Sequence, residues 1–192
     1  MRTLLLASTS PYRRALLARL ALPFDVVAPA VSEDDVANEP PAKRAARLAR
    51  AKAEAVAREN PEAIVIGSDQ VAALGTLVLH KPGQASRCRA QLTALSGNTA
   101  YFYTACAVVG ANARVNVSHV DTTGVAFRCL AADEIERYIE REQPFGCAGS
   151  FKAEALGITL FTRIESSDPT ALVGLPLIWL AAALRACGYP LP

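Results

Sequence analysis

Hydrophobic positions follow two spacings along the chain, and each spacing predicts one type of element. Short apolar or β-branched runs predict strands over residues 3–7, 25–28, 62–74, 99–110, 114–130 and 157–166. Apolar positions at helical spacing predict helices over residues 11–20, 41–60, 81–97, 131–142 and 174–188. In the second of these helices, one face collects Ala45, Leu48, Ala49, Ala53 and Val56.

Strands and helices alternate around one central hairpin, at residues 99–130. This order favours an α/β fold around a mixed β-sheet over a purely parallel sheet. No repeat, linker or low-complexity tract divides the 192 residues, so a single domain over residues 1–192 is expected, with or without two lobes. Within residues 62–74, a turn is expected at the Gly-Ser-Asp tripeptide that ends at Asp69, between two extended segments.

The composition excludes several classes of protein. Hydrophobic residues make up 52% of the chain, which is enough for a sizeable core. The 20 Lys and Arg against 18 Asp and Glu give a net charge of +2, so the chain has neither a polybasic arm for nucleic acid nor an acidic tail. No apolar run approaches the roughly 20 residues that cross a bilayer, and the first apolar run is too short for a signal peptide. We therefore expect a cytoplasmic protein with no membrane or nucleic-acid partner.

The cysteines and histidines indicate no metal site. The five cysteines are too scattered for a zinc site or a disulfide framework. Free, mostly buried thiols in a reducing compartment are expected. His80 and His119 are the only histidines, and neither lies in a pattern that favours a Cys–His nucleophilic pair.

Three segments carry chemistry that packing alone does not require, and the first opens a helix directly after a strand. Free N–H groups at such a helix start attract anions, and Ser8, Ser10 and Arg13 add donors. A simpler alternative is that Ser10 caps the helix, with Pro11 at its first position. Arg13 would then be an ordinary solvated charge.

The second and third segments hold carboxylates. Asp69 follows an apolar strand, where α/β proteins place functional carboxylates, and the alternative is an Asp that caps a turn. With residues 33–35 (Glu-Asp-Asp), it supplies oxygen ligands that suit Mg²⁺, although such a cluster by itself is more often a solvated loop. In the third segment, Lys152 and Glu154 join a cation and a carboxylate, and a surface ion pair is the alternative.

The lysines add a weaker indication. Only four of the 20 cations are lysines, and Lys52 and Lys81 lie near the acidic segments. A lysine kept in so arginine-rich a chain suggests a site that needs a compact ammonium. An anion site, several cations and a strand-end carboxylate together favour hydrolysis of a phosphate ester or anhydride.

The same segments resemble the Maf family of nucleoside triphosphate pyrophosphatases. Five ordered motifs carry the resemblance, at residues 4–17, 65–71, 80–97, 147–161 and 168–180. The family implies an elongated α/β fold similar to inosine triphosphatase, with a mixed sheet, flanking helices and two lobes around a cleft. It also implies hydrolysis of a nucleoside triphosphate to the monophosphate and pyrophosphate, with a divalent cation such as Mg²⁺ or Mn²⁺. The GSDQV and CAGSFKAE segments are more similar to the 7-methyl-GTP pyrophosphatase subfamily than to the dTTP/UTP branch.

The resemblance implies roles for single residues, with Asp69 as the proton acceptor and Tyr12, Gln70 and Glu154 at positions that select the base. With Lys152 of the third segment included, the expected catalytic residues are Asp69, Lys52 and Lys81, the metal ligands Glu33 and Asp69, and the substrate-binding residues Ser8, Tyr12, Arg13, Gln70, Lys152 and Glu154. The chain departs from the family pattern at Tyr12, where Trp is common, and at His80 and Ala155, which replace glycines.

Two alternatives stay open from the sequence. The first is the same chemistry on dTTP, UTP or another modified nucleotide. The second is a nucleotide-binding regulator of cell division without relevant turnover, which the intact set of Asp69, Lys52 and Lys81 argues against. The sequence does not determine the oligomeric state, and a homodimer is one open alternative.

Overall fold

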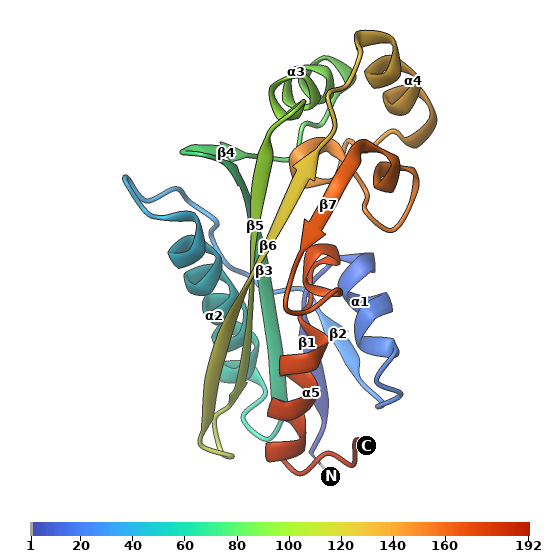
Figure 1. Ribbon diagram of the computed structural model, residues 1–192. Coiled ribbons are helices and arrows are strands. Elements are labelled where there is room, and N and C mark those ends of the chain that lie inside the picture. The colour runs from blue at the N-terminus through green and yellow to red at the C-terminus, as the bar shows by residue number, and fades with distance from the viewer. Residues whose placement is uncertain (1) are drawn as a thin grey trace. The chain divides into compact units, whose positions relative to one another are not determined.

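A computed structural model describes residues 2–192 and confirms the α/β fold around a mixed sheet (Figure 1). The strands are β1 (Leu4–Ala7), β2 (Asp25–Val27), β3 (Ile64–Leu74), β4 (Leu77–Leu79), β5 (Thr99–Gly110), β6 (Val115–Phe127) and β7 (Phe161–Glu165). The α-helices are α1 (Pro11–Ala18), α2 (Pro41–Glu59), α3 (Ala85–Leu95), α4 (Ala132–Glu142) and α5 (Leu177–Ala186). Short 3₁₀ helices cover Ala148–Ser150, Leu156–Leu160 and Ala171–Val173.

The sheet has the strand order β2-β1-β3-β5-β6-β7, and β4 pairs with β3. β1 lies parallel to β2 and to β3, whereas the β3–β4 and β6–β7 pairs are antiparallel. The chain divides into two compact units. The first unit comprises Met1–Gln70, Thr104–Asp121 and Asp168–Pro192, and the second comprises Val71–Tyr103 and Thr122–Ser167.

The core of the first unit lies between its part of the sheet and two helices. α1 and α5 cover one face of these strands, and α2 covers the other (Figure 1). Leu6 of β1 and Ile66 of β3 are fully buried against Leu17 of α1 and Leu180 of α5. Because side chains alternate across a strand, the neighbours of Ile66 face α2 instead.

The Gly-Ser-Asp turn predicted within residues 62–74 is wrong, since β3 runs unbroken through it. Gly67 serves helix packing and not a turn. A Cβ atom on Gly67 would lie 2.2 Å from the carbonyl oxygen of Ala49 and 2.6 Å from the nitrogen of Ala53, both on α2. The glycine therefore lets α2 approach the backbone of β3 directly.

The second unit has its own aromatic core. Phe151 makes edge-to-face contacts with Phe102, Phe127 and Phe161, at ring-centroid distances of 5.2, 5.6 and 4.9 Å. Such pairs are favourable because the positive ring edge meets the negative ring face. The helices α3 and α4 lie side by side in this unit (Figure 1), and Arg89 of α3 forms an ion pair with Glu136 of α4.

Other predictions also need correction. The third helix begins at Ala85, because residues 81–84 form a loop. The last strand begins at Phe161, since the 3₁₀ helix Leu156–Leu160 takes up residues that were expected to extend it. All five cysteines are free, but only Cys88 and Cys106 are buried, and Cys129 is exposed. Among residues 2–192, no helix has the length and apolar character needed to span a membrane.

Candidate active site

Two carboxylates converge on one ammonium in the first unit. The Lys52 Nζ atom lies 2.7 Å from Asp69 Oδ1 and 2.6 Å from Glu33 Oε1. Lys52 and Asp69 are buried, with 7% and 8% of their surface exposed, whereas the side chain of Glu33 is 59% exposed. The predicted residues Lys52, Asp69 and Glu33 thus form one cluster that opens to solvent on the side of Glu33.

Helix and strand geometry explain how Lys52 meets Asp69. Lys52 lies on the buried face of α2, three residues after Ala49 and four after Leu48. Asp69 lies two residues after Gly67 and so faces the same side of β3. The close approach of α2 at Gly67 therefore brings the ammonium of Lys52 against the carboxylate of Asp69.

The loop before α2 carries Glu33, and two arginines of α2 hold this loop. Arg47 donates two hydrogen bonds, of 2.8 and 2.7 Å, to the carboxylate of Glu39, and this bonding lowers the pKa of Glu39. Arg44 pairs with Asp35 and also donates to the carbonyl oxygen of Glu33 at 3.2 Å. The acidic loop is thus bound to the helix.

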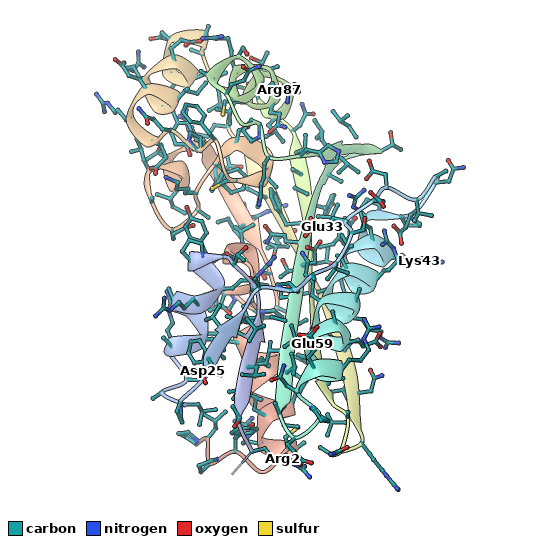
Figure 2. The ribbon with its side chains drawn as sticks, turned by 180° about the vertical axis from the view of Figure 1, so that it is seen from behind. Arg2, Asp25, Glu33, Lys43, Glu59 and Arg87 are labelled. Carbon is teal, nitrogen blue, oxygen red and sulfur yellow. The ribbon has the colours of Figure 1, made fainter. Side chains whose placement is uncertain are left out.

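The picture of the side chains agrees with this arrangement. Figure 2 shows Glu33 on the loop before α2 and Lys43 pointing outward from α2. Lys43 is exposed. Of the two lysines on this helix, only Lys52 is therefore turned toward the strand.

Replacing Gly67 by Ala is expected to destabilise the fold. The added methyl would overlap the backbone of α2, which must shift, and overpacking of this kind costs roughly 1–3 kcal/mol. Chemical denaturation followed by circular dichroism measures the effect. Gly146→Ala is the matched control, because a Cβ atom there meets nothing within 4 Å; equal stability of the two variants would contradict this account.

The other face of β3 anchors the loop that precedes α5. The hydroxyl of Ser68, which has one hydrogen to donate, lies within hydrogen-bond distance of the carbonyl oxygens of Ala105 and Gly174, at 2.8 and 2.9 Å. The side-chain amide of Gln70 donates to Thr104 Oγ1 at 2.8 Å and to two carbonyl oxygens, of residues 171 and 172. Gln70, expected to bind substrate, thus has its amide nitrogen engaged within the protein.

Arg13 joins the same loop to the carboxylate cluster. Its Nε donates to the carbonyl oxygen of Gly174 at 3.0 Å. Burial lowers the pKa of the Arg13 guanidinium, and the charges of Asp69 and Glu33 oppose this shift. Arg13 therefore lies within electrostatic range of both carboxylates. The two positive charges of Arg13 and Lys52 offset the two negative charges of Asp69 and Glu33.

Two serine hydroxyls at the start of α1 accept backbone N–H groups. Ser10 is the N-cap, as one alternative predicted, and its hydroxyl accepts the N–H of Arg13 at 3.4 Å. The buried hydroxyl of Ser8 accepts the N–H of Ser10 at 3.1 Å. Tyr12 is half-buried on the same helix. A role for these residues in anion or base binding stays a prediction.

Sequence reasoning missed the residues that shape the loop before α5. Asp168 is 3% exposed, and its carboxylate accepts the N–H groups of Thr170 and Ile178, at 2.8 and 2.6 Å. The hydroxyl of Thr170 donates to the carbonyl oxygen of Leu175 at 2.8 Å. An Asp-x-Thr tripeptide shortly before a helix is a capping signal that could have identified this loop.

The remaining predicted residues lie in the second unit. Lys81 is exposed on the loop between β4 and α3. The ammonium of Lys152 is bound by Glu142, at 2.9 Å from Oε1, and Glu154 is exposed two residues further on. The structure shows an ion pair between Lys152 and Glu142 where the alternative was a surface ion pair between Lys152 and Glu154.

The donor set around Lys52 suits a hard divalent cation better than zinc. Among residues 2–192, no group of three or more His, Cys, Asp and Glu side chains could hold a metal ion. Glu33 and Asp69 do offer two carboxylates that already share one positive charge. Mg²⁺ commonly takes one or two protein carboxylates and completes its shell with substrate phosphates and water.

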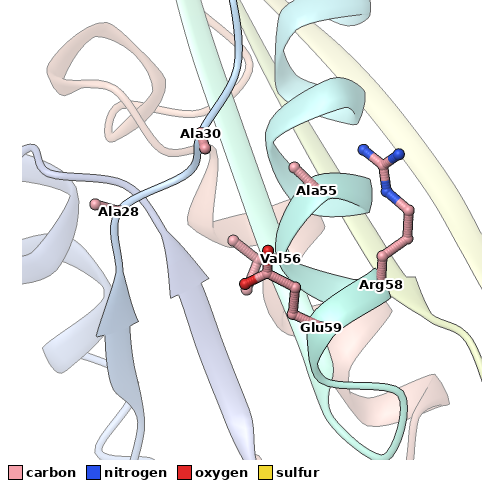
Figure 3. Close-up of a pocket in the computed structure, with 6 residues that line it drawn as sticks. All are labelled: Ala28, Ala30, Ala55, Val56, Arg58 and Glu59. Carbon is pink, nitrogen blue, oxygen red and sulfur yellow. The ribbon is translucent and has the colours of Figure 1, made fainter.

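A pocket of about 380 Å³ lies elsewhere in the first unit and is lined by Ala28, Ala30, Ala55, Val56, Arg58 and Glu59. None of these is a predicted site residue. Figure 3 shows Ala28 and Ala30 on one side of the pocket and the four lining residues of α2 on the other. Four of the six lining residues are apolar and the two charged ones have opposite charges, so the cluster of Lys52, Asp69 and Glu33 is the better candidate site.

Comparisons with known proteins place the chain among relatives that match nearly its whole length. A family model described as Maf-like protein matches residues 3–187. The chain is 53% identical to the 7-methyl-GTP pyrophosphatase of Xanthomonas axonopodis pv. citri over 192 residues, which are 100% of both chains. It is 53% identical to the 7-methyl-GTP pyrophosphatase of Alkalilimnicola ehrlichii over 188 residues, 98% of this chain and 94% of that one. A solved nucleoside-triphosphatase / dITP/XTP pyrophosphatase from Mycobacterium abscessus aligns over 97% of both chains, with a TM-score of 0.49 and 16% identity.

Proposed function

The chain belongs to the Maf family, and from this membership we propose that it hydrolyses 7-methyl-GTP to 7-methyl-GMP and pyrophosphate. The observation that carries the substrate is the 53% identity, over the full length, to relatives named 7-methyl-GTP pyrophosphatase. The cluster of Lys52, Asp69 and Glu33 supports the reaction class.

In the proposed mechanism, a water molecule attacks the α-phosphorus. Asp69 accepts the proton of this water, and the bond from the α-phosphorus to the oxygen that bridges it to the β-phosphorus breaks. Lys52 and Arg13 offset negative charge on the triphosphate and on the departing pyrophosphate. Lys81 of the second unit is proposed to do the same. Ser8 is proposed to bind the phosphates, and Gln70 is proposed to lie at a position that selects the base.

Glu33 and Asp69 would hold a divalent cation, Mg²⁺ or Mn²⁺. When bound, the cation supplies positive charge to the phosphate oxygens, which makes the phosphorus more electrophilic. The two carboxylates now share the ammonium of Lys52. A triphosphate attracts this ammonium, and so we expect substrate to free the carboxylates for a cation.

The site of water attack can be tested with isotopically labelled water. Hydrolysis in H₂¹⁸O is expected to place the label in 7-methyl-GMP and none in pyrophosphate, which mass spectrometry distinguishes. Label in pyrophosphate would indicate attack on the β-phosphorus. Release of orthophosphate with the diphosphate nucleotide would refute a pyrophosphatase altogether.

Glu154 is proposed to select the base and Tyr12 to stack on it. Guanine presents two adjacent donors, the ring N–H and the amino group, and one carboxylate accepts both. Uracil and thymine present one donor between two acceptors, which would repel a carboxylate. Methylation at the seventh position makes the ring positive, which strengthens its attraction to Glu154 and to the face of Tyr12.

Replacing Glu154 by Gln is expected to lower the selectivity ratio, defined as kcat/KM for 7-methyl-GTP divided by kcat/KM for UTP. A hydrogen bond to a charged group contributes roughly 1.5–3 kcal/mol, so the ratio should fall by about 10- to 100-fold. Steady-state release of pyrophosphate measures both constants. Glu140→Gln, at an exposed position of α4, is the control that should leave the ratio unchanged. An unaltered ratio in Glu154→Gln would remove Glu154 as the reader of the base.

A further inference from the structure

The segment that carries Glu154 is a small closed loop in the second unit. It begins at Lys152 and returns at Leu156, and the N–H of Ala155 donates to the carbonyl oxygen of Lys152 at 3.3 Å. A Cβ atom on Gly157 would lie 2.4 Å from the same carbonyl oxygen, so only glycine allows the chain to pass there. Glu154 is exposed at the tip of this loop.

One carboxylate at the end of α4 holds both ends of the loop. Glu142 Oε1 accepts from the ammonium of Lys152 at 2.9 Å, and Glu142 Oε2 accepts the backbone N–H of Leu156 at 3.0 Å. The backbone carbonyl oxygen of Glu142 is a further acceptor for Lys152, at 3.1 Å. The side chain of Glu142 is only 13% exposed, so water competes little for these bonds.

The helix fixes the loop at a second point one turn earlier. The hydroxyl of Tyr138 accepts the backbone N–H of Lys152 at 3.2 Å. Tyr138 is buried, and this burial raises the pKa of its hydroxyl. Tyr138 and Glu142 thus hold Lys152 by its backbone and by its side chain. The ammonium of Lys152 serves the loop's own structure.

We infer that Glu142 is a positioning residue for base selection, because it fixes the loop whose tip carries Glu154. This inference rests on the proposed function, in which Glu154 accepts two hydrogen bonds from the base. Two parallel hydrogen bonds require a fixed carboxylate, and a displacement of about 1 Å is enough to weaken both. Glu142 acts through the loop and makes no contact with the nucleotide.

The test compares wild type with Glu142→Gln. An amide offers one acceptor oxygen where the carboxylate offers two, so either the ammonium of Lys152 or the N–H of Leu156 loses its side-chain acceptor. The selectivity ratio is expected to fall by about tenfold, through a higher KM for 7-methyl-GTP and with kcat for UTP unchanged. The Glu142→Gln/Glu154→Gln double variant should show the same ratio as Glu154→Gln alone, since both changes act on one interaction.

Glu136→Gln is the matched control. Glu136 lies on the same helix, and its carboxylate forms an ion pair with Arg89 of α3, which is not part of the loop. Its replacement should leave the selectivity ratio at the wild-type value. Glu142→Asp keeps the negative charge, and its selectivity ratio is expected to lie between those of wild type and Glu142→Gln. If Glu142→Gln does not fold, Glu142→Asp takes its place in the test. The exchange rate of the Leu156 amide hydrogen should then be higher in Glu142→Asp than in wild type.

The outcomes separate this inference from the proposed function. An unchanged ratio in Glu142→Gln, beside a lowered ratio in Glu154→Gln, overturns the inference alone. An equal loss of kcat on both nucleotides also overturns it, because that loss indicates a general structural role. An unchanged ratio in Glu154→Gln overturns the inference together with the base-reading role of Glu154, whereas failure of the wild type to release pyrophosphate overturns the proposed function.

Discussion

Asp69→Asn is expected to lower kcat by about 10²- to 10⁴-fold, because the substitution removes the group proposed to take the proton of the attacking water. The amide keeps the shape of the carboxylate, and Glu33 remains at 2.6 Å as a partner for Lys52. The fold and the affinity for nucleotide should therefore change little. Pyrophosphate release measures the activity, and thermal unfolding and equilibrium binding check the other two quantities.

Asp25→Asn is the matched control for this substitution. Asp25 is exposed on β2 and is labelled on the outside of the molecule in Figure 2. Activity should be at the wild-type level in this variant. If Asp69→Asn retained activity within a few-fold of wild type, Asp69 would have no part in proton transfer.

Removing divalent cations is expected to abolish activity. The charges of Lys52 and Arg13 are already offset by those of Asp69 and Glu33, so the cluster has little net charge to offer a triphosphate that carries about four negative charges. Excess chelator should stop pyrophosphate release, and Mg²⁺ or Mn²⁺ should restore it.

Glu33→Gln tests whether Glu33 is a ligand of the divalent cation. With one carboxylate lost, a higher concentration of Mg²⁺ should be needed for half-maximal activity. Glu59→Gln, at an exposed position of the same unit, is the control and should leave that Mg²⁺ concentration unchanged. Full activity in excess chelator would instead point to catalysis by the lysines and arginines alone.

Periodicity predicted most of the fold because the patterns were local. The buried face of α2 and the N-cap at Ser10 follow from residues within a turn or two of each other. Gly67 was read as part of a turn for the same reason, since glycine in a short window indicates a bend. Glycine is needed at this position because the backbone of α2, about 15 residues earlier in the sequence, packs directly against it. A short sequence window around Gly67 does not include that helix.

The charged residues of the candidate site were predicted from the sequence, whereas the hydrogen bonds that hold the surrounding segments in place were not. Lys52, Asp69 and Glu33 were each named from residue type and context, and the structure brings all three together. The side-chain amide of Gln70 donates to backbone carbonyl oxygens of a distant segment, at residues 171 and 172. Backbone groups are the same in every residue, so the sequence carries no signal for these partners.

The Maf resemblance supplied what periodicity could not. Residue types indicated phosphate chemistry, and the five motifs added the family, which the match over residues 3–187 bears out. The roles of single residues stay predictions. Lys152 illustrates why: its motif position suggested a contact with substrate, whereas its ammonium is bound by Glu142.

The most direct measurement is pyrophosphate release by the purified wild-type protein from 7-methyl-GTP, GTP, dTTP and UTP under one set of conditions with Mg²⁺. The account predicts the highest kcat/KM for 7-methyl-GTP, with UTP and dTTP at least about tenfold lower because they lack the two adjacent donors that Glu154 would bind. A preference for dTTP or UTP would contradict the assigned substrate. Binding of nucleotides without any release of pyrophosphate would contradict the enzyme itself and would favour a nucleotide-binding regulator.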